Sequence, residues 1–307
     1  MGHFSISDLE QLSGVKAHTI RVWEQRYGLL RPHRTPTNIR LYSDDDLRRL
    51  LNVTTLNARG QRISHVAKLT DAEISVAVLA CAADAHDHHS QVNGLLAAML
   101  GFDEPRLNKL LGDATRHLGF EEMMLRVAYP LLQRIGLMWL AGTVDMAQEH
   151  LLAHLLRQKI LAATDALPPP AAGAQRWVLF LPAEEQHELA LLFMNYALRA
   201  RGHHTLYLGQ NLPTAGLAGV GVVYRPYAVV AVLTTQPERG RVVEFAREVL
   251  GHCPGAQLVL YGAPARQEGI TLPDNCVAPA LMTDFLALIA MPEPVPEPVP
   301  EPGPESA

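Results

Sequence analysis

Apolar residues recur with a helical period at the start of the chain. Behind Ser5 the spacing predicts a helix that a glycine interrupts, and the same period resumes over 16–26. From 29 to 42 the pattern changes to alternation among two prolines and three arginines, which is typical of a short β-ribbon. Ser43 and the three aspartates behind it predict the capped start of another helix. Residues 1–72 are therefore predicted to form a winged helix-turn-helix domain.

A second helical segment follows a stretch of small and polar residues. We interpret 73–90 as a linker, because its alanines and its His-Asp-His-His sequence offer little to bury. Over 91–170 the helical period returns with glycine breaks, which predicts about four helices. Three consecutive prolines end this segment. The pattern indicates a small helical bundle.

From 173 to 291 short apolar runs alternate with amphipathic stretches of helix length. Such an alternation is typical of a parallel sheet covered on both faces, so we predict a doubly wound, Rossmann-like α/β domain. Its predicted strands are 177–181, 204–208, 229–233 and 257–261. From 292 to 307 the chain repeats Glu-Pro-Val-Pro, which predicts a disordered, extended polyproline II tail without a core. The whole chain is therefore predicted to be multidomain.

Charge is distributed unevenly along the chain. The net charge is −5, but residues 1–70 carry 11 Lys and Arg against 6 Asp and Glu, whereas the remaining 237 carry 15 against 25. Phosphate binding depends on local positive charge, so only the N-terminal domain suits a nucleic acid. No stretch is long and apolar enough for a membrane helix, and the chain does not begin with a signal-peptide pattern. We therefore expect a cytoplasmic protein without a membrane partner.

The first domain carries an extended motif. Thr-Ile-Arg-Val-Trp-Glu-Gln-Arg-Tyr-Gly at 19–28 is followed by Arg34, Asn38 and Arg-Leu-Tyr-Ser at 40–43. This ordered set resembles the DNA-binding head of the MerR family of transcription regulators over about the first 70 residues. In that family the second helix enters the major groove of double-stranded operator DNA and the wing contacts the adjacent backbone. A basic module that binds protein is the alternative interpretation.

The MerR resemblance implies roles for individual residues of the head. The residues expected to contact DNA are His18, Thr19 and Arg21 on the second helix and Arg34, Arg40 and Tyr42 on the wing. The wing residues would contact phosphates. Ile20, Trp23 and Leu41 would instead form the small core of the head.

Two weaker motifs lie in the bundle and in the sheet domain. Trp139 is followed after nine residues by Glu149 and His150, a pattern that by itself predicts only a packed helix end and a solvated pair. Glu185 and His187 stand where the first strand gives way to a helix, the edge at which doubly wound sheets bind ligands. Neutral imidazole ligates transition metals, and a nearby carboxylate can accept its other N–H. A surface histidine without a ligand is the alternative.

Taken in order, the two motifs resemble the cobalamin-binding pair of domains of methionine synthase and of light-sensing MerR regulators of the CarH/LitR type. With the head in front, this resemblance spans nearly residues 1–290. It implies that His187 is the lower axial ligand of the cobalt of adenosylcobalamin and that Glu185 supports it. The other implied cofactor contacts are Trp139, Glu149 and His150 around the adenosyl group, and Thr234 or Thr235 together with Gly262 near the nucleotide tail.

Three positions depart from the family pattern. Ala190 and Ala263 stand where the wider cobalamin motif has glycine, and each adds a methyl group close to the nucleotide tail. Leu140 stands where some photoreceptors carry a second histidine that binds cobalt after illumination. A regulator that answers to a partner protein or to another ligand is therefore a second hypothesis.

The resemblance as a whole implies a transcription regulator without enzymatic activity. We expect a repressor that adenosylcobalamin controls, with light as a candidate signal. Assembly of a homo-oligomer, a dimer or a tetramer, would bring several heads onto adjacent DNA sites, and RNA polymerase is a candidate partner. A cobalamin-dependent methyltransferase subunit is a remote alternative, because no segment remains for a substrate domain of about 250 residues.

Overall fold

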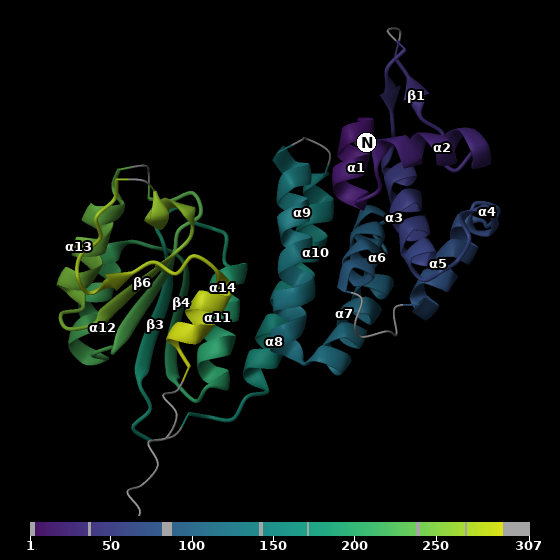
Figure 1. Cartoon of the computed structure of the whole chain (residues 1–307). Helices are drawn as coiled ribbons and strands as arrows, with labels where there is room; N and C mark the ends of the chain where they lie inside the picture. Colours follow the sequence, from purple (N-terminus) through teal and green to yellow (C-terminus); the bar gives the residue numbers. More distant parts are fainter. Residues whose placement is uncertain are drawn as a thin grey trace, which may run out of the picture. The chain divides into compact units, whose positions relative to one another are not determined.

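The computed structural model describes residues 4–35, 38–81, 88–140, 144–170, 172–237, 240–267 and 269–290. The chain forms two compact units, Met1–Lys159 and Ile160–Ala307, and each has its own core (Figure 1). Within the described ranges, no helix is both long enough and apolar enough to cross a membrane. The predicted tail lies outside the described residues.

The first unit begins with the predicted helix-turn-helix and wing. Its elements are α1 (Ile6–Ser13), α2 (Ala17–Tyr27), β1 (His33–Arg34), β2 (Arg40–Leu41), α3 (Asp44–Ala58) and α4 (Ile63–Val66). Ser5 caps α1 by accepting from the backbone N–H of Asp8 at 3.2 Å, and the Asp8 carboxylate accepts from the Ser5 N–H at 2.7 Å. The two short strands form an antiparallel ribbon that projects from the helices (Figure 1).

The predicted linker is wrong for most of its length. Helix α5 spans Asp71–Cys81 and helix α6 spans His88–Leu100, so only residues 82–87 lie outside the described part of this segment. Ile74 and Val78 are each 1% exposed and stand one helical turn apart, and α5 packs against α3. Composition suggested a linker because it could not show that α3 covers the apolar side of this segment.

Among the residues that the structure describes, the bundle contains four helical segments, as the sequence predicts. They are α6, α7 (Glu104–Leu118), the continuous run of α8 (Phe120–Met123), the π-helical turn η1 (Met124–Ala128) and α9 (Tyr129–Leu140), and finally α10 (Met146–Asp165). Helix α6 is buried from Ser90 to Leu100 because α3, α7 and the η1–α9 segment all pack against it. The head and the bundle therefore belong to one compact unit.

The second unit contains a five-stranded parallel sheet in the order β4-β3-β5-β6-β7. The strands are β3 (Arg176–Pro182), β4 (His204–Leu212), β5 (Ala228–Val232), β6 (Gln257–Tyr261) and β7 (Cys276–Val277). The helices are α11 (Leu189–Ala200), α12 (Ala218–Val223), α13 (Val242–His252) and α14 (Met282–Leu288), with short turns η2 (Thr214–Leu217) and η3 (Ala263–Arg266). Helices α12 and α13 lie on one face and α11 and α14 on the other (Figure 1). This is the predicted doubly wound fold.

The central strands explain why the sequence predicts this sheet so directly. Every residue of β5, and every residue of β3 after Arg176, is buried. Burying one large aliphatic or aromatic side chain contributes roughly 1.5–3 kcal/mol, so such runs are stable only with helices on both faces. The chain leaves β3 toward β4 on one side and returns to β5 on the other. The carboxyl ends of β3 and β5 therefore form the topological switch point of the sheet.

Candidate functional site

Glu185 lies at the centre of this switch point and is fully buried. Its Oε1 accepts from the backbone N–H groups of Gln186 and His187, both at 3.0 Å. Its Oε2 accepts from three consecutive backbone N–H groups after β5, at 3.0, 2.6 and 3.2 Å, those of Thr234, Thr235 and Gln236. The Thr235 hydroxyl donates to the same oxygen at 3.1 Å. One carboxylate thus joins the loops after β3 and β5.

These donors keep the Glu185 side chain ionised. Burial by itself would raise the pKa of Glu185, but the backbone N–H groups of Thr235, His187 and Gln236, together with the His187 ring, lower this pKa to about 2. A buried carboxylate with this many donors is a fixed negative charge at neutral pH. It can therefore orient a neighbouring N–H group and favour one tautomer of a histidine.

His187 is the neighbour that Glu185 orients. The Nδ1–H of His187 donates to Glu185 Oε1 at 2.6 Å, while 61% of the histidine side chain is exposed. With its proton held on Nδ1, the neutral ring carries its lone pair on Nε2. The sequence places these two residues at the correct edge, and the structure brings them together. The arrangement can present one imidazole nitrogen to a transition metal.

Thr234, Thr235 and Gly262, which were predicted near the nucleotide tail, make backbone contacts that hold this edge of the sheet together. The N–H groups of Thr234 and Thr235 are bound to Glu185, and Leu233 donates to the Tyr261 carbonyl at 2.7 Å. Gly262 has φ 128°, and a Cβ there would lie 1.9 Å from the Leu233 carbonyl oxygen. Only glycine fits such a close approach. The structure therefore brings Thr234, Thr235 and Gly262 to one edge, and it assigns each a structural role without any ligand.

A cavity of about 360 Å³ opens at the same edge. It lies between the end of β3, the start of η2 and the first half of α13, and Glu184, Thr214 and Arg241 are among its lining residues. None of the sequence-predicted cofactor residues lines it. The sequence analysis gave no signal for this cavity, because its walls come from three segments far apart along the chain.

The bundle residues of the second motif are solvent-accessible on their own unit. Trp139 is 48% exposed near the end of α9, although a helix-end tryptophan usually packs inside. Glu149 lies in the first turn of α10 and His150 follows it, with His150 Nδ1 3.0 Å from Glu149 Oε2. An exposed indole and a polar pair are suited to a ligand that stacks and accepts hydrogen bonds.

The predicted recognition residues of the head lie mostly at the surface. On α2, His18 and Arg21 are exposed and Thr19 is half-buried, while Ile20 is fully buried as predicted for the core. On β1, Arg34 is exposed and donates to the Asn38 side chain at 2.6 Å. These side chains can approach a phosphate or a base edge without unfolding the head.

The predicted phosphate contact of Tyr42 is wrong. Tyr42 is fully buried, and its hydroxyl donates to Glu24 Oε2 at 2.9 Å. Burial and the nearby Glu24 carboxylate raise the pKa of Tyr42. Arg40 is also drawn inward, because its Nε donates to Glu24 Oε1 at 3.1 Å and its side chain is 25% exposed. The alternation of the wing could not show which of its faces packs against α2.

Replacing Tyr42 with phenylalanine is expected to lower the free energy of unfolding by about 1.5–3 kcal/mol, because a hydrogen bond to a charged, part-buried carboxylate is lost. The salt dependence of binding to a random-sequence DNA duplex should stay unchanged. Arg34→Ala, at an exposed wing position, should instead reduce that slope by about one phosphate contact. Fluorescence anisotropy across a salt series distinguishes the two variants. An equal loss of slope in both would restore Tyr42 as a phosphate ligand.

Two further residues of these sites were missed by the sequence analysis. Glu24 joins Arg40 and Tyr42 to helix α2, and Gln236 supplies the third backbone N–H to Glu185. An acidic residue inside a basic recognition helix was the available signal for Glu24. A backbone donor has no side-chain signal, so Gln236 could be found only in three dimensions.

Two family models match the chain. The MerR HTH family regulatory protein model matches residues 4–73, and the B12 binding domain model matches residues 91–163. The chain is 34% identical to the HTH-type transcriptional repressor CarH of Myxococcus xanthus over 230 residues, which are 73% of this chain and 76% of that protein. It is 28% identical to the HTH-type transcriptional repressor CarA of Myxococcus xanthus over 264 residues, 85% of this chain and 87% of that protein.

A solved structure shares the fold of the chain. The Methanosarcina barkeri monomethylamine corrinoid protein matches with a TM-score of 0.50 and 13% sequence identity, over 64% of this chain and 96% of that protein. At this identity the likeness concerns the fold alone. Both of these relatives are named as transcriptional repressors. The chain belongs to the family of MerR-type transcription regulators with a B12-binding domain that includes the CarH and CarA repressors.

Proposed function

We propose that this regulator is a cytoplasmic repressor that binds double-stranded operator DNA under the control of adenosylcobalamin, and that light is its signal. The observation that carries the proposal is the Glu185–His187 pair at the switch point of the sheet. It combines an exposed imidazole, a fixed tautomer and a buried carboxylate. That combination suits an imidazole that binds a transition metal.

The Glu185–His187 contact and the accessible bundle residues suit this cofactor. His187 would hold the cobalt of the cofactor through Nε2, and Glu185 would hold the ring through Nδ1. Trp139, Glu149 and His150 would contact the adenosyl group from the bundle, where all three are accessible. Thr234, Thr235 and Gly262 would form the backbone edge beside the nucleotide tail. When bound, adenosylcobalamin supplies a cobalt–carbon bond that green or blue light breaks in family members.

Control of DNA binding would follow from linkage. If the cofactor binds the self-associated form better, it shifts the chain toward a dimer or tetramer. Association would place several heads on adjacent operator sites and multiply their weak individual affinities. His18, Thr19 and Arg21 would read the groove, and Arg34 would contact the backbone, with Arg40 contributing a part-buried charge. RNA polymerase would be the partner excluded from the occupied promoter.

The test is to purify the chain in darkness with adenosylcobalamin. We expect the vitamin to remain bound through gel filtration with its visible absorption. Green illumination should change the spectrum, lower the mass in sedimentation velocity and weaken binding to duplex DNA. If the purified chain is coloured but illumination changes neither its spectrum nor its mass, light is not the signal. The supply of the vitamin would then be what regulates DNA binding.

A second candidate function is a regulator that answers to a partner protein or another ligand. The observation that favours it is Ala190, half-buried in the first turn of α11, where the wider cobalamin motif has glycine. Ala263, which replaces the second glycine, is exposed at the start of η3 and crowds less. A colourless purified chain would support this second candidate and contradict the first.

A further inference from the structure

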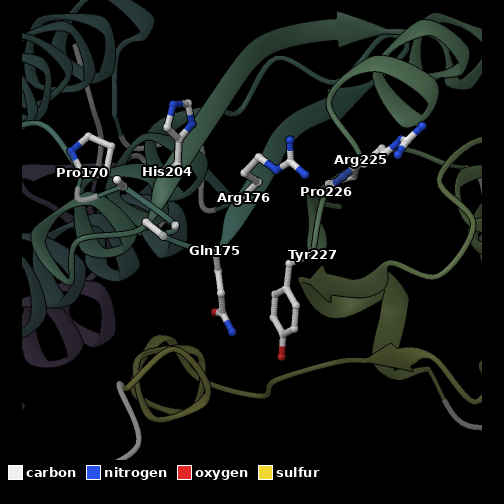
Figure 2. Close-up of a pocket in the computed structure, with 10 residues that line it drawn as sticks. Pro170, Gln175, Arg176, His204, Arg225, Pro226 and Tyr227 are labelled. Carbon is white, nitrogen blue, oxygen red and sulfur yellow. The ribbon is translucent and has the colours of Figure 1, made fainter.

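A hollow of about 650 Å³ lies at the opposite edge of the sheet from His187, where the parallel strands begin (Figure 2). Its walls come from the segment before β3, the start of β4 and the loop before β5. Nothing in the cofactor proposal uses this edge. The hollow belongs entirely to the second unit, so its shape is set by the sheet domain alone.

The hollow is positively charged. Arg176 and Arg225 are both exposed at its wall and flank Pro226 in Figure 2. The Arg176 guanidinium lies 5.6 Å from the centre of the Tyr224 ring, and neither arginine forms an ion pair with a described residue. Among the described residues that line the hollow, none is acidic. Two guanidinium groups without carboxylates favour an anionic ligand with oxygen acceptors.

The same wall presents an aromatic and proline surface. Tyr227 is 43% exposed, and its ring packs against buried Trp177 at 5.7 Å between centroids. Pro170 and Pro226 also line the hollow (Figure 2). Grooves with exposed aromatic side chains bind proline-rich segments, because the polyproline II helix is already ordered and presents flat rings. The wall therefore combines the features of an anion site and of a proline-rich peptide site.

The described chain ends beside this wall. The Ile289 carbonyl after α14 lies 3.4 Å from His203 Nε2, and His203 directly precedes His204, which lines the hollow. The His203 ring packs against Trp177 at 5.6 Å, on the same indole that supports Tyr227. The segment before residue 291 is thus separated from Tyr227 by the rings of His203 and Trp177.

The sequence that follows has the complementary chemistry. Residues 291–307 alternate prolines with glutamates at every fourth position, Glu293, Glu297, Glu301 and Glu305, and contain no lysine or arginine. An extended proline-rich chain advances about 3.1 Å per residue, so these residues span far more than the hollow. A tether this short gives an effective concentration on the order of millimolar.

We propose that the hollow at the amino end of the sheet is a binding site for an acidic, proline-rich peptide, and that its occupant is the chain's own segment 291–307. The prolines stack against the exposed Tyr227, and the glutamates pair with Arg176 and Arg225. The tail is then an intramolecular ligand of the sheet domain, held at the edge remote from His187.

The test uses a fluorescent peptide with the sequence of residues 291–307 and a chain that ends at Met291. Anisotropy should show saturable binding to the shortened chain, and about tenfold weaker binding to the Arg176→Glu/Arg225→Glu variant of that chain. A peptide with the four glutamates changed to glutamine should bind about as weakly. The full-length chain should bind the peptide least, because its own tail competes.

Arg247→Glu is the matched control, since Arg247 is exposed on α13 and does not line the hollow. This variant of the shortened chain should bind the peptide with unchanged affinity. Three results would overturn the proposal: no saturable binding to the shortened chain, equal weakening by Arg247→Glu, or equal affinity of the full-length and shortened chains. Circular dichroism of each variant separates a lost contact from a lost fold.

Discussion

Replacing His187 with alanine is expected to release cobalamin from the purified chain. The variant loses an imidazole whose Nδ1 is held by a buried carboxylate at 2.6 Å. Changing a residue that merely supports a metal ligand costs 10–100-fold in affinity, so removing the ligand itself should weaken retention by more than about a hundredfold. Equilibrium dialysis and the visible spectrum of the retained vitamin measure the effect. Added imidazole should restore part of the bound spectrum, because it replaces the missing ligand.

His252→Ala provides the matched control for this experiment. His252 is half-buried at the end of α13 and belongs to neither proposed site. Its variant should retain the vitamin and the spectrum of the unmodified chain. An unchanged cobalt spectrum in His187→Ala would contradict the ligand assignment and leave a regulator whose trigger is another molecule.

Replacing Glu185 with glutamine should have the largest effect on stability. The pKa of Glu185 in the folded chain is about 2, below its ordinary value of 4.5. The ionised carboxylate therefore stabilises the fold above pH 4.5, and this contribution is lost as the pH falls through 2. The difference in pKa corresponds to about 3 kcal/mol at neutral pH. Glutamine keeps the shape but places an amide N–H₂ against backbone N–H donors, which adds to the loss.

The measurement follows the fluorescence of Trp177, which is 3% exposed in the sheet domain, in chains whose other tryptophans are phenylalanine. Urea unfolding of the unmodified chain and of Glu185→Gln should differ by more than about 3 kcal/mol at pH 7. This difference should shrink by about 3 kcal/mol toward pH 2, where only the loss from the amide remains. Glu184→Gln, at the exposed neighbouring position, should match the unmodified chain throughout. A constant difference between pH 7 and pH 2 would show that ionisation of Glu185 is not the source.

Most helices and strands could be predicted from the sequence, because their apolar residues either recur on one face or occupy every position. Runs such as 177–181 and 229–233 are apolar at every position, so a covered parallel strand is the only arrangement that satisfies them. Strand β7 spans only Cys276–Val277, and two residues carry no period, so it was not predicted. The linker assignment was wrong for a related reason. The burial of Ile74 and Val78 depends on the packing of α5 against α3, which the local sequence does not show.

In the head and at the switch point, the sequence also could not give the contacts of two individual residues, Tyr42 and Gly262. Tyr42 was expected at DNA together with Arg34 and Arg40, yet Glu24 on the preceding helix accepts a hydrogen bond from its hydroxyl, and Tyr42 is fully buried. Gly262 was expected beside a nucleotide tail, whereas the close approach of the Leu233 carbonyl already requires a glycine. In both cases the partner lies at least 18 residues away along the chain.

By itself the sequence determined the order of the domains, the parallel sheet, the basic head and the short Glu185-x-His187 motif, because each rests on local period, local charge or neighbouring residues. Only the tertiary structure decided what these residues do. It joined Glu185 to the Thr235 N–H, 50 residues away, at 2.6 Å, and it carried the end of α14 to His203. Parallel strands collect their carboxyl ends at one edge and their amino ends at the other, so both sites are products of strand order that no local pattern records.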